Sequence, residues 1–372
     1  MGKIEKALSI LEPIARHSYD EPDSLVYLGI AYVQAEKPQA AVSVLEEAKE
    51  LVEDHPVIEL FLGRALMALG RYEDAEEELS IAVDLDPTEP RAWDDLGKVF
   101  YVQGKYAEAI GALRNGLEQF PNDIRLQSML ALSLYRLGDY ESSISCWKRV
   151  IEEKPDFLTA KSNYAYLLLA KDRLEEAIPI VEEIQENNPD DYRSYLLEAD
   201  LKLREGDLET SQKCLEILLE RDPENIEALV RMAVVAKLQG NTVVSNDYFE
   251  LVEAQVESVE SCWQCLCEAY RKLGWRTRYL NCLLRWSKID SGSAASHIEL
   301  AKVYADMGYD DLAFDAWERA IEILGWLRVS CIQCGCEEKL EPHDINRVRA
   351  AGSIKCPSCN ASIRLPESIT AF

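Results

Sequence analysis

The sequence predicts an all-α protein, a solenoid of repeated helix pairs, with a small β domain at its C-terminal end. Nine consecutive units of 34 residues fill residues 22–327 without an insertion or deletion. A fixed period of this length is typical of stacked helix pairs in which each pair contacts only its neighbours. The period stops after residue 327, and two Cys-x-x-Cys pairs follow, a spacing typical of a metal-stabilised domain.

Composition limits the classes of partner and of compartment. The chain has 372 residues, 48% of them hydrophobic, and a formal net charge of −27. Such an acidic surface repels bare nucleic acid and anionic lipid. The sequence has no apolar stretch of about 18 residues and no apolar secretory segment after Met1. We therefore expect a cytoplasmic protein with reduced thiols, which contacts a membrane only through a missing anchor or through a partner.

Residues 1–21 resemble the second helix of a repeat whose first helix is missing. Ala7 and Leu11 stand at the places where the second helix of later units carries a small and a large apolar residue. We expect this half repeat to cap the array. The alternative is that the natural chain is longer at its front, where it could have held a membrane anchor or more of a repeat.

The third unit, residues 90–123, shows most clearly why certain residues recur. Its pattern is Trp93-x2-Leu96-Gly97-x2-Phe100, followed by Gly104, Tyr106, Ala109, Leu113, Gly116 and Pro121. Residues three or four apart share one face of a helix, so Leu96 and Phe100 face the partner helix together. A small residue at Gly97 lets two helix axes approach closely. Gly104 ends the first helix, and Pro121 cannot continue the second.

This pattern resembles the tetratricopeptide repeat (TPR) family, which has W-x2-L-G-x2-Y, then A-x3-F, then P. The resemblance covers nine repeats over residues 22–327. It implies a right-handed superhelix in which the first helix of each repeat lines a concave groove. It also implies a scaffold or adaptor that binds other proteins, because solenoids of this kind bind rather than catalyse.

The positions that would line this groove are rich in basic and aromatic residues. They are Arg64, Lys98, Tyr101, Arg125, Tyr135, Arg136, Tyr166, Arg193 and Arg204, with acids at Asp94 and Asp200. A basic strip inside an acidic shell favours an anionic ligand, and arginine suits carboxylates. We expect the groove to bind a protein or peptide segment rich in Asp and Glu, or a C-terminal carboxylate. The alternative is that these are ordinary surface residues whose stems cover apolar seams.

Two Cys-x-x-Cys pairs mark the tail, residues 328–372, as a metal-binding domain. The predicted ligands are Cys331, Cys334, Cys356 and Cys359. Four thiolates close a tetrahedral site and leave no open position for catalysis, which favours a structural role. Short strands are expected at residues 328–330 and 361–365. So small a domain cannot bury enough surface to fold alone, so the metal would supply much of its stability.

The expected metal is Zn²⁺, with iron as the alternative. The cysteine spacing resembles a zinc ribbon and also the rubredoxin type of site. Rubredoxins are aromatic-rich electron carriers, whereas Phe372 is the only aromatic residue after Trp326. An iron site would make this chain an electron-transfer protein. Cys336 and His343 are spare candidate ligands, more simply explained as a thiol and a loop histidine without a metal.

No motif for nucleotide binding or for nucleophilic or metal catalysis is present, so we expect no enzyme activity. Cysteines also occur within the predicted helices. We interpret these as small buried hydrophobic residues, with metal or redox chemistry as the alternative. They are Cys146, Cys214, Cys262, Cys265, Cys267 and Cys282.

A repeat array followed by four paired cysteines also resembles the lipopolysaccharide assembly protein B family. The resemblance rests on this order of parts and on the two Cys-x-x-Cys pairs, Cys331/Cys334 and Cys356/Cys359. It implies a cytoplasmic adaptor at the inner membrane that controls proteolysis of a lipid A biosynthesis enzyme. A further alternative is nucleic-acid binding through the zinc ribbon, which the near-neutral tail and the acidic array disfavour.

Overall fold

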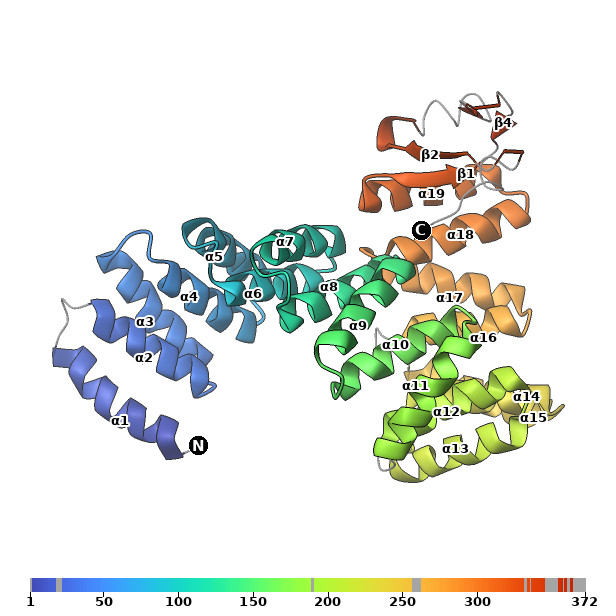
Figure 1. The fold of residues 1–372 in the computed structure, drawn as a ribbon, viewed down its shortest axis with the longest axis horizontal. Helices are drawn as coiled ribbons and strands as arrows, with labels where there is room; N and C mark the ends of the chain where they lie inside the picture. The colour runs from blue at the N-terminus through green and yellow to red at the C-terminus, as the bar shows by residue number, and fades with distance from the viewer. Residues whose placement is uncertain are drawn as a thin grey trace. The chain divides into compact units, whose positions relative to one another are not determined.

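The computed structural model describes residues 2–17, 22–188, 191–255, 262–330, 333–334, 336–344, 354–356, 358–359 and 362–363. Within these residues the chain forms 19 α-helices and four short β-strands (Figure 1). The predicted all-α array of repeated helix pairs is thus confirmed. The chain divides into two compact units, Met1–Ser133 and Leu134–Phe372, and the boundary falls inside one helix.

The first unit contains seven helices and the beginning of an eighth. Helix α1 packs against α2, and each later pair is joined by a short turn. The helices are α1 (Gly2–His17), α2 (Pro22–Gln34), α3 (Pro38–Leu51), α4 (Pro56–Ala68), α5 (Tyr72–Leu85), α6 (Pro90–Val102), α7 (Tyr106–Gln119) and the first part of α8 (Ile124–Leu137).

The second unit continues the same alternation of first and second helices. Its helices after α8 are α9 (Tyr140–Glu153), α10 (Leu158–Ala170), α11 (Leu174–Asn187), α12 (Tyr192–Glu205), α13 (Leu208–Arg221), α14 (Ile226–Leu238), α15 (Thr242–Gln255), α16 (Cys262–Lys272), α17 (Arg276–Ile289), α18 (Ala294–Asp306) and α19 (Asp310–Leu324). Apart from α16, which begins at Cys262, the first helices from α2 to α18 begin 34 residues apart, as the repeat predicts.

Helix pairing follows from the small residues that the repeat keeps. A Cβ atom added at Gly97 of α6 would lie 2.7 Å from Leu113 of α7, so only a small residue permits this approach. Gly104 between the two helices has φ +75°, a left-handed conformation that suits glycine and ends α6. Leu113 is fully buried at this contact.

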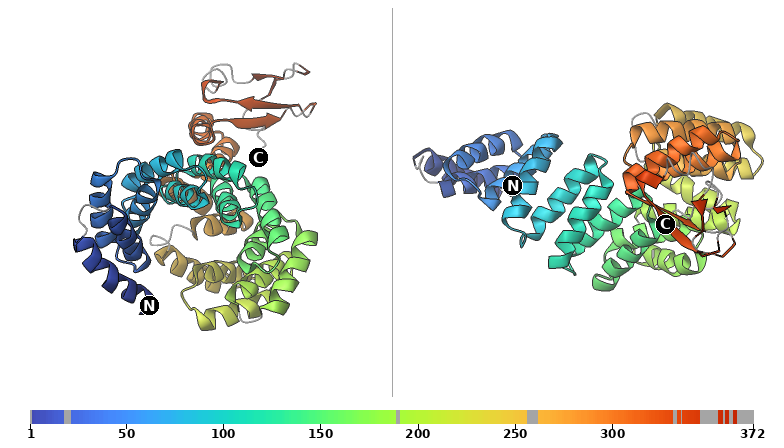
Figure 2. Two further views of the ribbon diagram at one scale, coloured as in Figure 1. Left: turned by 60° about the vertical axis from the view of Figure 1, so that its left-hand side comes forward. Right: turned by 90° about the horizontal axis from the view of Figure 1, so that it is seen from above.

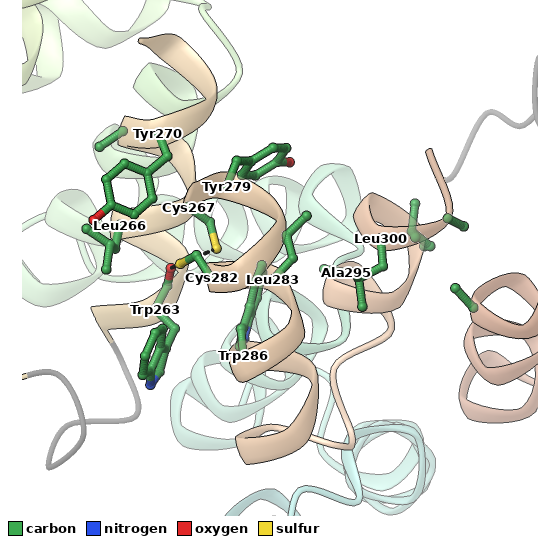
Figure 3. Packing of buried hydrophobic residues seen from close by; sticks show 14 of the residues in the cluster. Trp263, Leu266, Cys267, Tyr270, Tyr279, Cys282, Leu283, Trp286, Ala295 and Leu300 are labelled. Carbon is green, nitrogen blue, oxygen red and sulfur yellow. Dashed lines mark hydrogen bonds between the residues drawn. The ribbon is translucent and has the colours of Figure 1, made fainter. Parts of the chain in front are cut away.

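Each unit has its own apolar core along the seam between helices. In the first unit the core includes Leu45, Ile58 and Leu79, all fully buried. In the second unit large aromatic side chains fill it, among them Trp263 and Trp286 (Figure 3).

Of the predicted β domain, the structure describes two short strand pairs. Strand β1 (Leu327–Ser330) pairs antiparallel with β2 (Glu337–Leu340), and β3 (Ile354–Lys355) pairs antiparallel with β4 (Ser362–Ile363). Strand β1 overlaps the strand predicted at 328–330, and β4 falls within the one predicted at 361–365. The zinc-ribbon form of residues 328–372 stays a prediction, because much of this tail lies outside the described residues.

The second unit turns so that its early and late repeats meet (Figure 2). Tyr135 near the end of α8 contacts Gln264 of α16, and a Cβ at Gly138 would lie 3.0 Å from Ala295 of α18. The first helices of distant repeats therefore face one another inside this unit. Among the helices that the structure describes, none is both long and apolar enough to cross a bilayer.

Candidate functional site

Four of the predicted groove residues lie on the first helices of the first unit, and their cations rest on buried acids. Lys98 Nζ of α6 lies 2.6 Å from Asp94 Oδ2 and 3.6 Å from Asp95 Oδ1. Arg64 of α4 donates from Nε to Asp95. The Asp95 carboxylate thus joins two neighbouring first helices, and Arg64, Asp95 and Lys98 form one polar chain.

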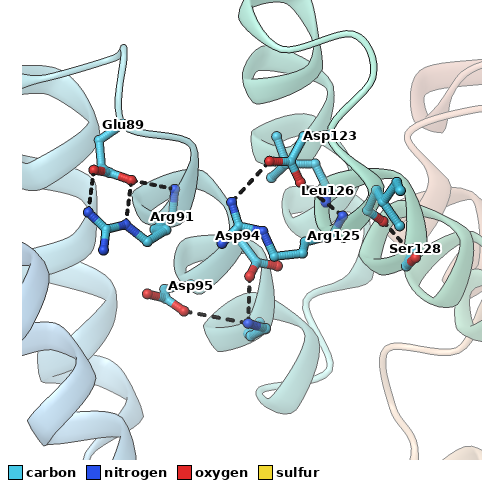
Figure 4. A network of polar contacts seen from close by, with 10 residues as sticks. Glu89, Arg91, Asp94, Asp95, Asp123, Arg125, Leu126 and Ser128 are labelled. Carbon is cyan, nitrogen blue, oxygen red and sulfur yellow. Dashed lines mark hydrogen bonds and ion pairs between the residues drawn. The ribbon is translucent and has the colours of Figure 1, made fainter. Parts of the chain in front are cut away.

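The same arrangement recurs at the start of the next first helix. Asp123 accepts the backbone N–H of Arg125 at 2.9 Å and its side chain at 3.0 Å, and Glu89 holds Arg91 in the same way (Figure 4). Both acids satisfy helix N-terminal N–H groups, which favour a negative charge. Each acid therefore also fixes the position of an arginine side chain.

Exposure separates the two signs of charge on this face. The side chains of Lys98 and Arg125 are 42% and 51% exposed, whereas those of Asp94 and Asp95 are 6% and 8% exposed. Burial raises the pKa of Asp95, and the neighbouring Arg64 and Lys98 oppose this. Solvent therefore meets N–H donors rather than carboxylates, although acids and bases are paired.

Tyr101 of α6 completes the predicted set in this unit. Its ring packs edge-on against Tyr106, with centroids 5.5 Å apart. Within the described part of the chain, Asp94 Oδ1 is buried and has no hydrogen-bond partner. The face therefore combines an aromatic side chain with a polar chain of paired charges, in which one buried carboxylate oxygen of Asp94 is not hydrogen-bonded.

In the second unit two predicted groove residues, Tyr135 and Arg136, contact the chain's own later repeats, and a third, Tyr166, packs against Tyr135. Tyr135 donates its hydroxyl to Gln264 Oε1 at 2.9 Å, and its ring lies edge-on to that of Tyr166 at 6.2 Å. Arg136 Nη2 lies 2.8 Å from Asp290 Oδ2. These side chains therefore serve contacts within the unit, which the sequence pattern does not reveal.

Arg193 and Arg204 of α12 make looser contacts. Arg193 Nη1 lies 3.4 Å from Thr159 Oγ1, and its guanidinium lies over the ring of Tyr192. Arg204 Nη1 lies 3.4 Å from Asp172, and among the described residues its buried Nε has no hydrogen-bond partner. The nine groove residues thus do not form one described surface, and their binding role stays a prediction.

Sequence reasoning missed a buried ion pair in the second unit. Arg231 of α14 binds Asp200 of α12 through two bonds, Nε to Oδ1 at 2.8 Å and Nη2 to Oδ2 at 2.7 Å. Burial raises the pKa of Asp200, but Arg231 more than offsets this and lowers it. Asp200 and Arg231 are 31 residues apart in the sequence. Arg64 and Asp95 are also 31 residues apart, with the base first and the acid second. This common spacing could have predicted the Asp200–Arg231 pair.

Three of the four predicted metal ligands come together in the tail. The sulfur atoms of Cys334, Cys356 and Cys359 all lie within 4.8 Å of one another. The fourth predicted ligand, Cys331, lies outside the described residues. Burial raises the pKa of Cys356, but the N–H groups of Cys359 and Ser358 more than offset this and lower it to about 6. Three sulfur atoms in such a group can hold a soft metal ion.

Cys336, a spare candidate in the sequence, stands apart from this group. Its sulfur accepts the Ser358 hydroxyl at 3.1 Å, and its side chain packs against the core of the second unit. His343 lies beside Glu341 and Asp344 and is outside the three-sulfur group. Neither residue belongs to the described group of three sulfur atoms.

Comparisons with known proteins find a known repeat in part of this chain. A tetratricopeptide repeat family model matches residues 62–124 and 128–192. A tetratricopeptide repeat protein from Parabacteroides merdae is 18% identical with a TM-score of 0.52, over 62% of this chain and 91% of that one. This likeness shows the fold alone. No curated protein is similar enough in sequence to match.

Two further solved structures are similar over about half of this chain. Pseudomonas aeruginosa PilF is 20% identical with a TM-score of 0.48, over 54% of this chain and 92% of its own. YrrB, described as a TPR protein with an unusual peptide-binding site, is 16% identical with a TM-score of 0.43, over 50% of this chain and 95% of its own.

Proposed function

We propose that this tetratricopeptide repeat protein is a non-catalytic scaffold that binds an acidic protein segment, or a C-terminal carboxylate, on the first helices of its N-terminal unit. The observation that carries the proposal is the opposite exposure of the two charges on that face. Lys98 and Arg125 reach solvent, whereas the acids that pair with them, Asp94 and Asp95 for Lys98 and Asp123 for Arg125, are much less exposed. A face of this kind offers fixed hydrogen-bond donors to a ligand carboxylate, although the protein as a whole has a net charge of −27.

Ion pairing with the buried acids prepares the cations for binding. Because Asp94 and Asp123 already hold Lys98 and Arg125 in place, less side-chain freedom is lost when a ligand carboxylate arrives. Arg64 and Tyr101 extend the same face along α4 and α6. In the second unit, Arg193 and Arg204 of α12 would offer a separate basic surface. Tyr135, Arg136 and Tyr166 would contribute only where the partner replaces their contacts within that unit.

The tail supports a second part of the proposal, a structural metal site. We assign Cys334, Cys356 and Cys359, with Cys331, as ligands of Zn²⁺. Sulfur ligands and a closed tetrahedral set suit zinc and leave no reactive position. The runner-up is iron, as in rubredoxin-like electron carriers. The order of parts shared with the lipopolysaccharide assembly protein B family extends the proposal to envelope assembly as the process that the scaffold serves.

Charge reversal on the first-helix face tests the binding proposal. The probe is a fluorescein-labelled peptide with four consecutive glutamates and a free C-terminus, alongside its C-terminal amide and a Gly-Ser peptide of equal length. We expect the acidic peptide to bind at low salt, and Lys98→Glu/Arg125→Glu to weaken it at least tenfold. A stronger loss for the free acid than for the amide would identify the C-terminal carboxylate as the preferred ligand.

A matched control removes the effect of net charge. Arg71→Glu/Arg114→Glu makes the same change in charge at exposed positions outside the first helices of the same unit. We expect this variant to bind like the wild type. Equal weakening by both double variants, or equal binding of the acidic and Gly-Ser peptides by the wild type, would overturn the proposal.

A further inference from the structure

Helices α16 and α17 bring two buried thiols together. The sulfur of Cys267 lies 2.7 Å from that of Cys282, and the two side chains point toward each other between the helices (Figure 3). Each residue is 3% exposed. Unbonded sulfur atoms do not normally come this close, and a disulfide holds them at about 2.05 Å. The backbones of the two helices therefore already stand within reach of a covalent bond.

The repeat explains why these two residues meet. Cys267 occupies the place that Gly97 has in the third repeat, where the two helices of a pair approach most closely. Cys282 occupies the place of Ala112 on the facing helix. In the third repeat both places hold small residues, glycine and alanine, so nothing larger than a methyl group stands between the two helices at these places. In the eighth repeat both places hold a cysteine, and their sulfur atoms meet between α16 and α17.

Two other repeats provide internal controls. Cys146 in the fourth repeat and Cys214 in the sixth stand at the same place as Cys282. The residues that correspond to Cys267 there are Ala131 and Ala199. Of the nine predicted repeats, the eighth alone has cysteine at both places. The juxtaposition is therefore a property of this repeat and not of cysteine-rich helices in general.

We propose that Cys267 and Cys282 form a disulfide bond that cross-links α16 to α17. The oxidant is a small external disulfide of the glutathione disulfide class. The thiolate of one cysteine attacks it, which forms a mixed disulfide and releases one small thiol. The second cysteine then attacks the mixed disulfide and releases the other small thiol. The two cysteines lose two electrons and two protons, and the external disulfide is reduced to two thiols.

Burial decides when this bond forms. The bond requires a thiolate and access for the oxidant, and the folded helix pair offers neither freely. Burial raises the pKa of Cys267 well above its ordinary value. Oxidation therefore takes place while the pair folds or opens locally, and the closed pair then shields the bond from reductants.

Mass spectrometry of blocked thiols tests this proposal. The full-length chain is refolded with glutathione disulfide, unfolded without reductant, alkylated and digested with trypsin. We expect the peptide ending at Arg271 to be linked to the peptide 279–285, and Cys214 to be alkylated. The same treatment of native protein in low urea provides a second route if refolding in oxidant fails.

Variants with the alanine of other repeats fix the identity of the bond. Cys267→Ala has the residue of the fourth and sixth repeats at that place, so we expect it to fold and to leave Cys282 alkylated. Cys214→Ala should keep the link. Alkylation of both Cys267 and Cys282 in oxidised, helical wild-type protein would overturn the proposal. So would a link that persists in Cys267→Ala. Neither outcome would affect binding on the first unit.

Discussion

Arg136 and Asp290 form an ion pair of 2.8 Å although they stand 154 positions apart in the chain. Arg136 lies near the end of α8, and Asp290 follows the last residue of α17. The Asp290 side chain is 5% exposed and that of Arg136 is 22% exposed. Together with Tyr135 and Gln264, this pair closes the second unit on itself. The closure uses residues that an open solenoid would present to a partner.

A double-mutant cycle on this pair should show that the closure is stabilising. We expect Arg136→Met to lower the free energy of unfolding by on the order of 2 kcal/mol, because Asp290 would keep a buried charge without this partner. Asp290→Asn should lower the free energy of unfolding less in the Arg136→Met variant than it does in the wild type. Urea unfolding measures each value. The matched pair Arg204 and Asp172, 3.4 Å apart with Asp172 77% exposed, should show coupling near zero. Additive losses at Arg136 and Asp290 would contradict this account.

Two glycines of one repeat should respond oppositely to alanine. Gly111 of α7 has open space where a Cβ would stand, so Gly111→Ala should stabilise the first unit by about 0.5–1 kcal/mol through helix propensity. At Gly97 a Cβ would lie 2.7 Å from buried Leu113, so the same change requires repacking and should leave the protein less stable than Gly111→Ala by about 1–3 kcal/mol. Thermal unfolding compares the two, and equal shifts would contradict the close approach.

Glu59 of α4 should make the stability of the first unit depend on pH. Its side chain is 2% exposed, and burial, with a contribution from Glu78, raises its pKa to about 7 while Lys49 opposes this. In the unfolded chain the group ionises near 4.5. Between these two values the unfolded state loses its proton first, so native stability falls as the pH rises.

Replacing Glu59 with glutamine should remove this dependence. We expect Glu59→Gln to be more stable than the wild type above pH 7, by on the order of 2 kcal/mol, and to match it below pH 4.5. Hydrogen exchange of α4 peptides at several pH values measures the difference. Glu77→Gln, at an exposed position on α5, should leave the pH dependence unchanged. A stability gap that does not vary with pH would contradict the prediction.

The parts of this fold that depend on local pattern could be predicted, and those that depend on the curvature of the array could not. The helix pairs, the turn at Gly104 and the meeting of Cys356 with Cys359 follow from short-range spacing. The contact of Arg136 with Asp290 requires four repeats to turn through a definite angle, and small differences in each helix contact set that angle. The Arg64–Asp95 pair lies between these cases, because its 31-residue spacing recurs at Asp200–Arg231.

The tail should hold one metal ion per chain, and its removal should unfold the tail before the helices. Cys356→Ser and Cys359→Ser should each release the ion, because each takes one sulfur from the group within 4.8 Å. Cys336→Ser should retain it, since Cys336 stands outside that group and accepts a hydrogen bond from Ser358. Elemental analysis of the purified chain counts the ion and separates zinc from iron.

A chelator should then expose residues after Leu327 to protease while the helical circular dichroism stays constant, because the helix pairs have their own core. Loss of metal from Cys336→Ser with retention in Cys356→Ser would contradict this assignment of ligands.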